Sequence, residues 1–301
     1  MEPKRSPLPY LVAISFMWGS AYLFLKISSA DIPPLMLAAL RAGVAIPVLV
    51  VVCVALRQFA IGWLVLRDMF VIGTLNGWLP NCLAAFAITS ISSAEAGVLQ
   101  ATTPIITGLL AAALLPDESL SVKTLVCLVG GFLGVILVVA SSTNGETTGT
   151  FFGYLLMIGV AFSFGAGAVY ARWAKPKAPA LIASGQLVVA ACVALFASFL
   201  AGEPWQLDWS NALVFSVTML GAFSTALPAV LFLVVISRYK AVKVGAASFL
   251  QPIWAIALGA LFLSERISGL QLLGSLIIVF SVLLITAQFR SMRETRPKDQ
   301  T

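Results

Sequence analysis

The amino-acid sequence predicts an all-α membrane protein built from ten transmembrane helices, arranged as two inverted-topology repeats of five helices each. Three observations lead to this prediction: a strongly apolar composition, apolar stretches of membrane-spanning length, and a second half that repeats residues of the first. Apolar residues make up 60% of the 301 positions and charged residues only 10%, with a mean hydropathy of +1.02. A water-soluble domain of this length cannot bury so much apolar surface, so the solvent around it is a bilayer.

Ten apolar stretches are long enough to cross the hydrocarbon core, which takes about 20 helical residues. Their apolar character is continuous, whereas strands of a membrane barrel alternate between apolar and polar residues. The first stretch is too long for a signal peptide, and its removal would break the repeat described below. In order, the stretches cover residues 9–29, 33–56, 68–89, 94–115, 122–141, 152–174, 179–201, 211–236, 241–263 and 267–288.

The distribution of cations between the connecting segments predicts the orientation of the chain. If the N-terminus is cytoplasmic, nearly all Lys and Arg residues of the connections lie on the cytoplasmic side, and only Arg266 lies opposite. This bias predicts that both termini face the cytoplasm, with residues 289–301 forming a basic cytoplasmic tail. It also accounts for the isoelectric point near 9.3, so nucleic-acid binding is not needed to explain that value.

An internal repeat relates residues 8–141 to residues 152–288. Because each copy holds an odd number of helices, the second copy enters the membrane from the opposite side. Two inverted copies can exchange their conformations, which makes transport the default hypothesis. An offset of 148 places Gly73 on Gly221, Pro80 on Pro228, Gly97 on Gly245 and Pro104 on Pro252, and nearby offsets place Gly19 on Gly165, Lys26 on Arg172, Pro34 on Pro179, Arg41 on Gln186 and Glu118 on Glu265.

Four prolines at matching positions indicate interrupted helices: Pro80, Pro104, Pro228 and Pro252. Each removes a backbone donor and frees a carbonyl about one turn earlier, which a bilayer tolerates only where protein or a wet cavity accepts it. Interrupted helices in corresponding positions of two repeats point to a substrate site near the midplane. The alternative is four packed kinks without a role in function.

Amide and hydroxyl side chains accompany these prolines on the same spans. In the fourth span Gln100, Thr103 and Thr107 are spaced so that they share one helical face. We expect such groups to bind substrate, the alternative being hydrogen bonds between helices worth about 0.6–2 kcal/mol each. The candidate polar binding residues are Asn76, Asn81, Gln100, Thr103, Ser224, Thr225, Ser248 and Gln251.

Five aromatic residues fall inside spans, away from the interfaces where Trp and Tyr usually gather. Trp18 and Tyr22 are four residues apart, which lets both rings face the same side of the first helix. We expect these rings to stack on an aromatic substrate. The candidates are Trp18, Tyr22, Trp78, Tyr170 and Trp254.

Two cations lie within or at the end of spans and are candidates for a charged pathway. Arg41 lies inside the second span, where a charge costs at least about 2.5 kcal/mol and usually marks a pathway or a buried partner. Lys26 continues the Trp18 and Tyr22 face, although snorkelling to the headgroups explains it as well. The chain has no His, and no Asp or Glu falls near the middle of a span, so we expect transport without obligatory proton coupling.

Several segments resemble the EamA family of the drug/metabolite transporter superfamily. They are "MWGSAYLFLK", "LAALRAG", "LQATTPI", "FLQPIW", "LLPDESLS" and "LFLSERIS", and the resemblance covers about residues 8–288. It implies a central cavity walled by spans 1–4 and 6–9, with spans 5 and 10 peripheral, and export of small metabolites from the bacterial cytoplasm. Within the family the chain is similar to aromatic amino-acid exporters. It departs from strict repetition at Pro116-Asp117-Glu118, where the second copy has Ser264-Glu265.

The sequence therefore predicts a multi-pass transporter of the bacterial cytoplasmic (inner) membrane that exports small amphipathic metabolites, foremost aromatic amino acids. Its expected partners are the substrate and the lipid bilayer, with no nucleic acid, and it is expected to be a monomer or weak homodimer. We expect no cofactor, no metal site and no enzymatic activity, because the interior offers little acid or base chemistry. The alternatives are an antiporter of phosphorylated or nucleotide-sugar metabolites and a membrane scaffold without flux.

Overall fold

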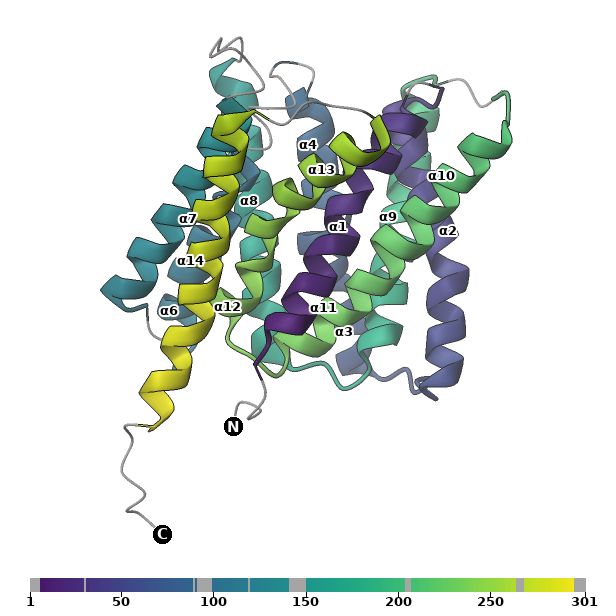
Figure 1. Cartoon of the computed structure of the whole chain (residues 1–301). Coiled ribbons are helices and arrows are strands. Elements are labelled where there is room, and N and C mark those ends of the chain that lie inside the picture. Colours follow the sequence, from purple (N-terminus) through teal and green to yellow (C-terminus); the bar gives the residue numbers. More distant parts are fainter. Residues whose placement is uncertain are drawn as a thin grey trace.

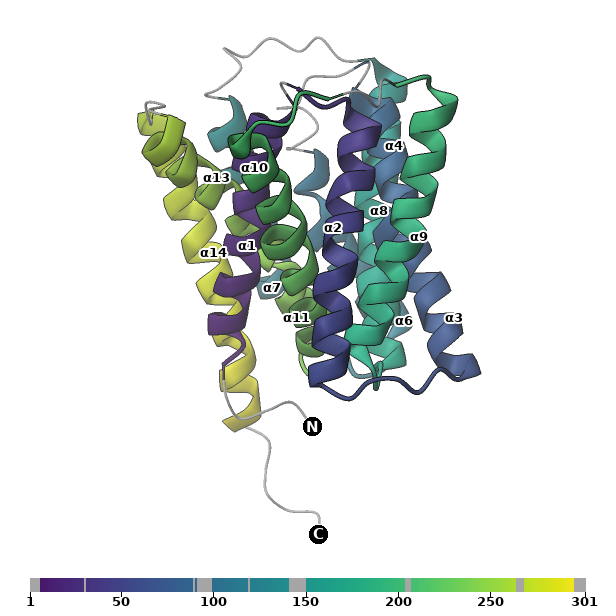
Figure 2. The same cartoon turned by 90° about the vertical axis from the view of Figure 1, so that its right-hand side faces the viewer.

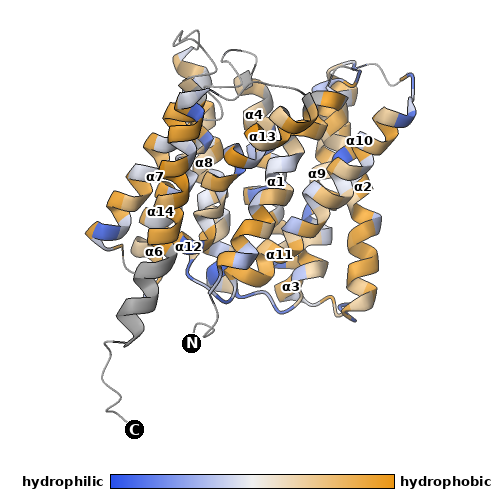
Figure 3. Ribbon diagram, in the orientation of Figure 1, coloured by the Kyte–Doolittle hydropathy of each residue, from blue (hydrophilic) through white to orange (hydrophobic). Residues whose placement is uncertain are grey.

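The computed structural model describes residues 6–29, 31–88, 90, 99–118, 120–140, 150–203, 207–263 and 268–294. Within these ranges the chain forms helices joined by short connections, and it contains no strand (Figure 1). Six helical segments are long and apolar enough to cross a membrane, and three shorter apolar helices accompany them. Most residues of the helices are hydrophobic (Figure 3). The protein is an all-helical, multi-pass membrane protein.

Along the first half of the chain, the third apolar stretch is divided by a five-residue π-helix. The elements are α1 (Leu8–Ser28), α2 (Pro34–Ala55), α3 (Trp63–Gly73), the π-helix η1 (Thr74–Trp78), α4 (Leu79–Ile88), α6 (Thr103–Leu114) and α7 (Val122–Ala140).

Along the second half the eighth apolar stretch is divided in the same way, and the ninth is divided near its start. The elements are α8 (Phe151–Ala174), α9 (Pro179–Leu200), α10 (Asn211–Gly221), the π-helix η2 (Ala222–Ala226), α11 (Leu227–Ile236), α12 (Ala241–Gly245), α13 (Ala247–Leu263) and α14 (Gly269–Glu294).

Three boundaries differ from the predicted stretches by more than a few residues. Helix α3 begins at Trp63 instead of residue 68, because residues 63–66 are apolar and continue the helix. Helix α6 begins at Thr103, so Pro104 occupies the first turn, where a proline needs no backbone donor. Residues 91–98 of the fourth predicted span lie outside the described residues. Helix α14 continues to Glu294, through residues of good helix propensity.

Helices from the two halves of the chain pack against one another. Helix α2 lies along α9, and α1 packs against α13, while α8 packs against α4 and α6 (Figures 1 and 2). Helices α7 and α14 form a further pair at one side of the bundle. Gly130 and Gly134 form a G-x-x-x-G sequence in α7 of this pair, and a Cβ at Gly134 would come 2.8 Å from the Gly274 carbonyl oxygen. These glycines therefore serve close packing within the chain.

The α2–α9 pair is joined at both ends by side chains that bond to helix N-termini. The Glu203 carboxylate, just beyond α9, accepts hydrogen bonds from the Leu35 N–H at 3.1 Å and the Met36 N–H at 2.7 Å. At the other end Gln58, just beyond α2, accepts one from the Ala180 N–H at 3.0 Å. Each contact satisfies a backbone donor that the first turn of a helix leaves open. Each of the two helices is thus capped by a residue that follows the other.

Candidate functional site

Two interrupted helices form the centre of the candidate site. Their π-helical segments start at Thr74 and Ala222, 148 positions apart, which is also the separation of Pro80 and Pro228. Each proline follows its π-helix by two residues, where its missing N–H prevents the regular α-helical hydrogen bond. In the first break Gly77 adopts non-helical angles, φ −109° and ψ −105°. Short π-helical segments within α-helices frequently occur at functional sites.

Three consecutive carbonyl oxygens of the first break accept hydrogen bonds from side chains. The Leu75 oxygen accepts one from Ser163 Oγ at 2.8 Å, and the Gly77 oxygen accepts one from Asn81 Nδ2 at 2.8 Å. Between them, the Asn76 oxygen accepts one from Gln186 Nε2 at 3.1 Å. Ser163 belongs to α8 and Gln186 to α9. Two of the three donors that hold the break in the first half thus come from the second half.

The second break is held through hydroxyl groups. Thr225 Oγ1 donates to the Leu220 carbonyl oxygen at 2.7 Å and accepts from Arg41 Nε at 3.3 Å. The Ser224 hydroxyl, which is fully buried, lies 2.8 Å from the Ser20 hydroxyl of α1. The Ser224 hydroxyl therefore links the second break to α1.

A glycine brings each break close to the second helix of the opposite half. A Cβ at Gly221 would come 2.6 Å from Val44 Cβ and 2.9 Å from the Arg41 carbonyl oxygen. A Cβ at Gly73 would come 3.4 Å from Gln186 Cα. Gly73 and Gly221 correspond in the repeat, as do Arg41 and Gln186, so the two close approaches are equivalent.

Trp18 belongs to α1, and Trp254 of α13 contacts the same helix. The Trp254 indole donates from Nε1 to Ser15 Oγ at 3.0 Å, and its ring meets Phe16 edge-on at a centroid distance of 5.1 Å. The Trp18 ring packs against Phe232 of α11 at 5.5 Å. The structure therefore brings both rings to α1, where each packs against a different aromatic neighbour.

The other candidate aromatic residues lie elsewhere in the bundle. The Trp78 indole donates to Thr74 Oγ1 within its own break at 3.2 Å. Tyr170 is apart from these rings, because its hydroxyl donates to Asp68 Oδ1 at 2.7 Å and its ring packs on Trp173. Asp68 is 5% exposed and also pairs with a neighbouring arginine at 2.8 Å. Sequence reasoning missed this buried carboxylate, because it placed the start of the span at residue 68.

The polar face of the fourth span is satisfied largely by its own backbone. Thr103 Oγ1 donates to the Gln100 carbonyl oxygen at 2.6 Å, and Thr107 Oγ1 donates to the Thr103 oxygen at 2.8 Å. In α13 Ser248 and Gln251 are half-buried and precede Pro252, which lies inside the helix. The side chains of Tyr22 and Lys26 lie outside the described part of the structure, although their backbone belongs to α1.

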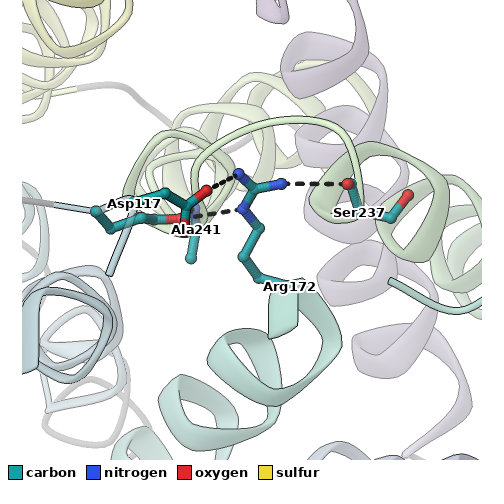
Figure 4. A network of polar contacts seen from close by, with 5 residues as sticks. Asp117, Arg172, Ser237 and Ala241 are labelled. Atoms are coloured by element: carbon teal, nitrogen blue, oxygen red, sulfur yellow. Dashed lines mark hydrogen bonds and ion pairs between the residues drawn. The ribbon is translucent and has the colours of Figure 1, made fainter. Parts of the chain in front are cut away.

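A buried ionic network joins the ends of α6, α8 and α11 at the edge of the bundle where α1 begins and α14 ends (Figures 1 and 4). Arg172 of α8 donates from Nε to Glu118 Oε1 at 3.3 Å, from Nη2 to Asp117 Oδ2 at 2.8 Å and from Nη1 to the Ser237 carbonyl oxygen at 3.2 Å. Glu118 Oε1 also accepts the Ala241 N–H at 2.6 Å. The network thus fastens three separate parts of the chain together: the residues after α6, the end of α8 and the connection between α11 and α12.

The Glu118 carboxyl of this network lies almost wholly out of solvent. Its side chain is 3% exposed, and its Oε2 atom has no hydrogen-bond partner among the described residues. Burial raises the pKa of Glu118, although the Ala241 N–H and the charges of Arg172 and Lys240 act in the opposite direction. The sequence offered a signal for this pair, because Glu118 and Arg172 both had counterparts in the repeat, but it did not bring the two residues together.

Comparison with known proteins identifies the family of this chain. The model of the EamA-like transporter family matches residues 6–140 and again residues 151–287. The chain is 23% identical to the Bacillus subtilis protein described as uncharacterized transporter YoaV, covering 93% of this chain and 96% of that one. It is 25% identical to a probable amino-acid metabolite efflux pump of Escherichia coli, covering 93% of each.

A solved crystal structure has the same fold, with a TM-score of 0.81 over 93% of this chain and 97% of the other, at 18% sequence identity. The two family matches together cover most of the sequence. The helical bundle, the interrupted helices and these matches agree that the protein belongs to the EamA-like transporter family.

Proposed function

We propose that the protein exports small amphipathic metabolites, foremost aromatic amino acids, across the bacterial cytoplasmic membrane by alternating access. Membership of a transporter family supports movement of a small molecule across a bilayer. The relative described as a probable amino-acid metabolite efflux pump supports the substrate class, at 25% identity. The surplus of cations on the connections that we assign to the cytoplasm supports a location with both termini on that side.

The proposed architecture is two inverted units of five helices, residues 8–141 and 152–288. The family model matches each of these regions separately, which supports a duplication. The equal spacing of the two π-helices and of the two prolines supports it independently. In such inverted pairs the substrate site lies between the repeats near the midplane, where helices are interrupted.

A single observation carries the proposed site: each interrupted helix is contacted by a long polar side chain from the opposite half. Arg41 reaches Thr225 in the second break, and Gln186 reaches Asn76 in the first. A substrate between the two breaks would meet a guanidinium, which suits a carboxylate, together with amide and hydroxyl oxygens, which suit an ammonium. The proposed binding residues are Trp18, Tyr22, Asn76, Trp78, Asn81, Gln100, Thr103, Ser224, Thr225, Ser248, Gln251 and Trp254, with Arg41 and Lys26 on the charged pathway.

Tyr170 is not part of this proposed set, because its hydroxyl is bonded to Asp68 in a separate cluster. We further propose that movement does not require a proton gradient. The chain contains no His, and the described residues bury two carboxylates, Asp68 and Glu118. Asp68 lies in the second turn of α3 and is paired with Arg67, and Glu118 lies in the connection between α6 and α7. A proton-coupled carrier normally keeps a titratable group at depth.

Purified protein in liposomes loaded with unlabelled tryptophan is expected to take up labelled tryptophan, phenylalanine and tyrosine in counterflow. Uptake of alanine or glycine should be weaker, because only aromatic substrates gain from ring stacking. Collapse of the proton gradient with an uncoupler should leave the initial rate unchanged. Strict dependence on the gradient would contradict uncoupled transport, and preference for sugar phosphates over amino acids would replace the proposed substrate class.

Substitution of Arg41 by Gln is expected to raise the KM for tryptophan by about 10- to 100-fold, the usual value of a hydrogen bond to a charged group. Transport of tryptophanamide, which lacks the carboxylate, should change much less. Arg238→Gln provides a matched control on an exposed turn. An equal loss for both substrates in Arg41→Gln would assign Arg41 to the stability of the fold instead of to carboxylate recognition.

A further inference from the structure

The first break depends on donors from other helices because of Pro80. In an α-helix the backbone N–H of residue 80 would bond to the Asn76 oxygen, and in a π-helix it would bond to the Leu75 oxygen. Proline has no N–H, so it can serve neither. The two oxygens accept instead from Gln186 Nε2 and Ser163 Oγ, at 3.1 and 2.8 Å.

Gln186 is placed closely enough to fix the position of this break. Gln186 is 9% exposed. A Cβ on Gly73 would come 3.4 Å from Gln186 Cα, and a Cβ on Gly77 would come 3.4 Å from Gln186 Cγ. The absence of side chains at both glycines thus lets the backbone of the break lie directly on Gln186. Its amide is then directed at the oxygen of Asn76, the residue between them.

Different side-chain contacts hold the second break. There the Thr225 hydroxyl, which belongs to the break itself, donates to the Leu220 oxygen and accepts a hydrogen bond from Arg41 Nε. The first break is thus held by a side-chain amide that donates to a backbone oxygen. The second is held by a threonine hydroxyl that bonds both to a backbone oxygen and to a guanidinium.

We propose that Gln186 is a positioning residue whose amide replaces the donor missing at Pro80. It thereby holds the Thr74–Trp78 turn in the conformation that presents Asn76 and Trp78 to the substrate. This inference rests on the proposed transport function, because Asn76 and Trp78 are binding residues only within that proposal. It also links the halves, since a residue of α9 sets the backbone of the third span.

A double-mutant cycle between Gln186 and Pro80 tests the inference. Gln186→Leu is expected to raise the KM for tryptophan by about 3- to 10-fold, the usual effect of one hydrogen bond, with little change in the maximal rate. Gln186→Met should behave like Gln186→Leu, because a thioether keeps the length of the side chain but has no proton to donate. Pro80→Ala supplies a backbone N–H one turn after Asn76, so it should restore most of the affinity of Gln186→Leu.

The matched control is Pro228→Ala, which makes the same change in the second break. It should not rescue Gln186→Leu. Additive effects of Gln186→Leu and Pro80→Ala, or equal rescue by Pro228→Ala, would overturn the proposed role of Gln186.

Hydrogen–deuterium exchange distinguishes this inference from the proposed function. Residues 74–79 of Gln186→Leu should exchange faster than in the wild type, and Pro80→Ala should slow them again. Unchanged exchange in Gln186→Leu would overturn the positioning role even if transport falls. If the exchange rates change as expected but the wild-type protein transports no amino acid, the role of Gln186 is supported and the proposed function is overturned.

Discussion

Replacement of Arg172 by Gln is expected to lower the free energy of unfolding by about 3–5 kcal/mol at neutral pH, the usual cost of removing one partner from a buried ion pair. The Arg172 side chain is 8% exposed and that of Glu118 only 3% exposed. Without the guanidinium, the Glu118 carboxylate keeps the Ala241 N–H as a partner but loses its paired charge. Thermal unfolding of the detergent-solubilised protein, followed by tryptophan fluorescence, measures the effect.

The deficit of Arg172→Gln should depend on pH. Burial already raises the pKa of Glu118 above its ordinary value of 4.5, and removal of Arg172 raises it further. The folded state then holds the Glu118 proton more tightly than the unfolded state does. Stability therefore falls as the pH rises from about 4.5 through the folded pKa, and it should fall further in the variant than in the wild type. The charged groups that face Glu118 are Arg172, Asp117 and Lys240.

Two carboxyl variants serve as controls for this prediction. Glu118→Gln removes the buried charge but keeps an oxygen for the Ala241 N–H, so combining it with Arg172→Gln should recover part of the stability and abolish the added pH dependence. Asp117→Asn should cost no more than about 1 kcal/mol, since the Asp117 side chain is 58% exposed. A pH-independent deficit in Arg172→Gln, or one no larger than that of Asp117→Asn, would refute the assigned role of the buried pair.

The second large effect is expected from Gly19→Ala in α1. A Cβ at Gly19 would lie 2.5 Å from Trp254 Cβ and 2.9 Å from the Gln251 carbonyl oxygen. Neither atom is the end of a flexible side chain, so α1 and α13 must move apart. Overpacking of this kind typically costs about 1–3 kcal/mol. It should also lengthen the bond between Trp254 and Ser15 and reduce tryptophan counterflow.

Gly43→Ala in α2 is the matched control, because no atom lies within 4 Å of a Cβ at that position. It should be as stable as the wild type or slightly more stable, since alanine favours a helix over glycine. Both variants are compared by melting temperature and by initial rate of counterflow. Equal behaviour of the two alanine variants would contradict the tight contact between α1 and α13.

Hydropathy and proline positions were enough to predict where most helices lie and where two of them break. Continuous apolar stretches report directly on burial in lipid, and a proline reports directly on a missing donor. The same signals failed at boundaries: Pro104 was assigned to the inside of a span, but it fits the first turn of α6 equally well. The sequence cannot distinguish these two positions, because proline occurs both within interrupted helices and in the first turn of a helix.

The partners of the interrupted helices were beyond sequence reasoning. Gln186 entered only as the counterpart of Arg41, and Ser163 did not enter at all, because a hydrogen bond over 110 or 88 positions leaves no local pattern. The pair of Arg172 and Glu118, 54 positions apart, was missed for the same reason. The local sequence shows whether a residue is polar or apolar and where it lies in a span, but its contacts depend on how helices from the two halves pack.

The reciprocal capping of α2 and α9 has a mechanical consequence. Because α2 and α9 are hydrogen-bonded to each other at both ends, they should resist sliding and separation and move as one rigid unit. A conformational change that opens one face of the bundle and closes the other would then move the remaining helices relative to the α2–α9 pair. Disulfides engineered between α2 and α9 should accordingly leave the rate of transport unchanged, because these two helices are not expected to move relative to each other.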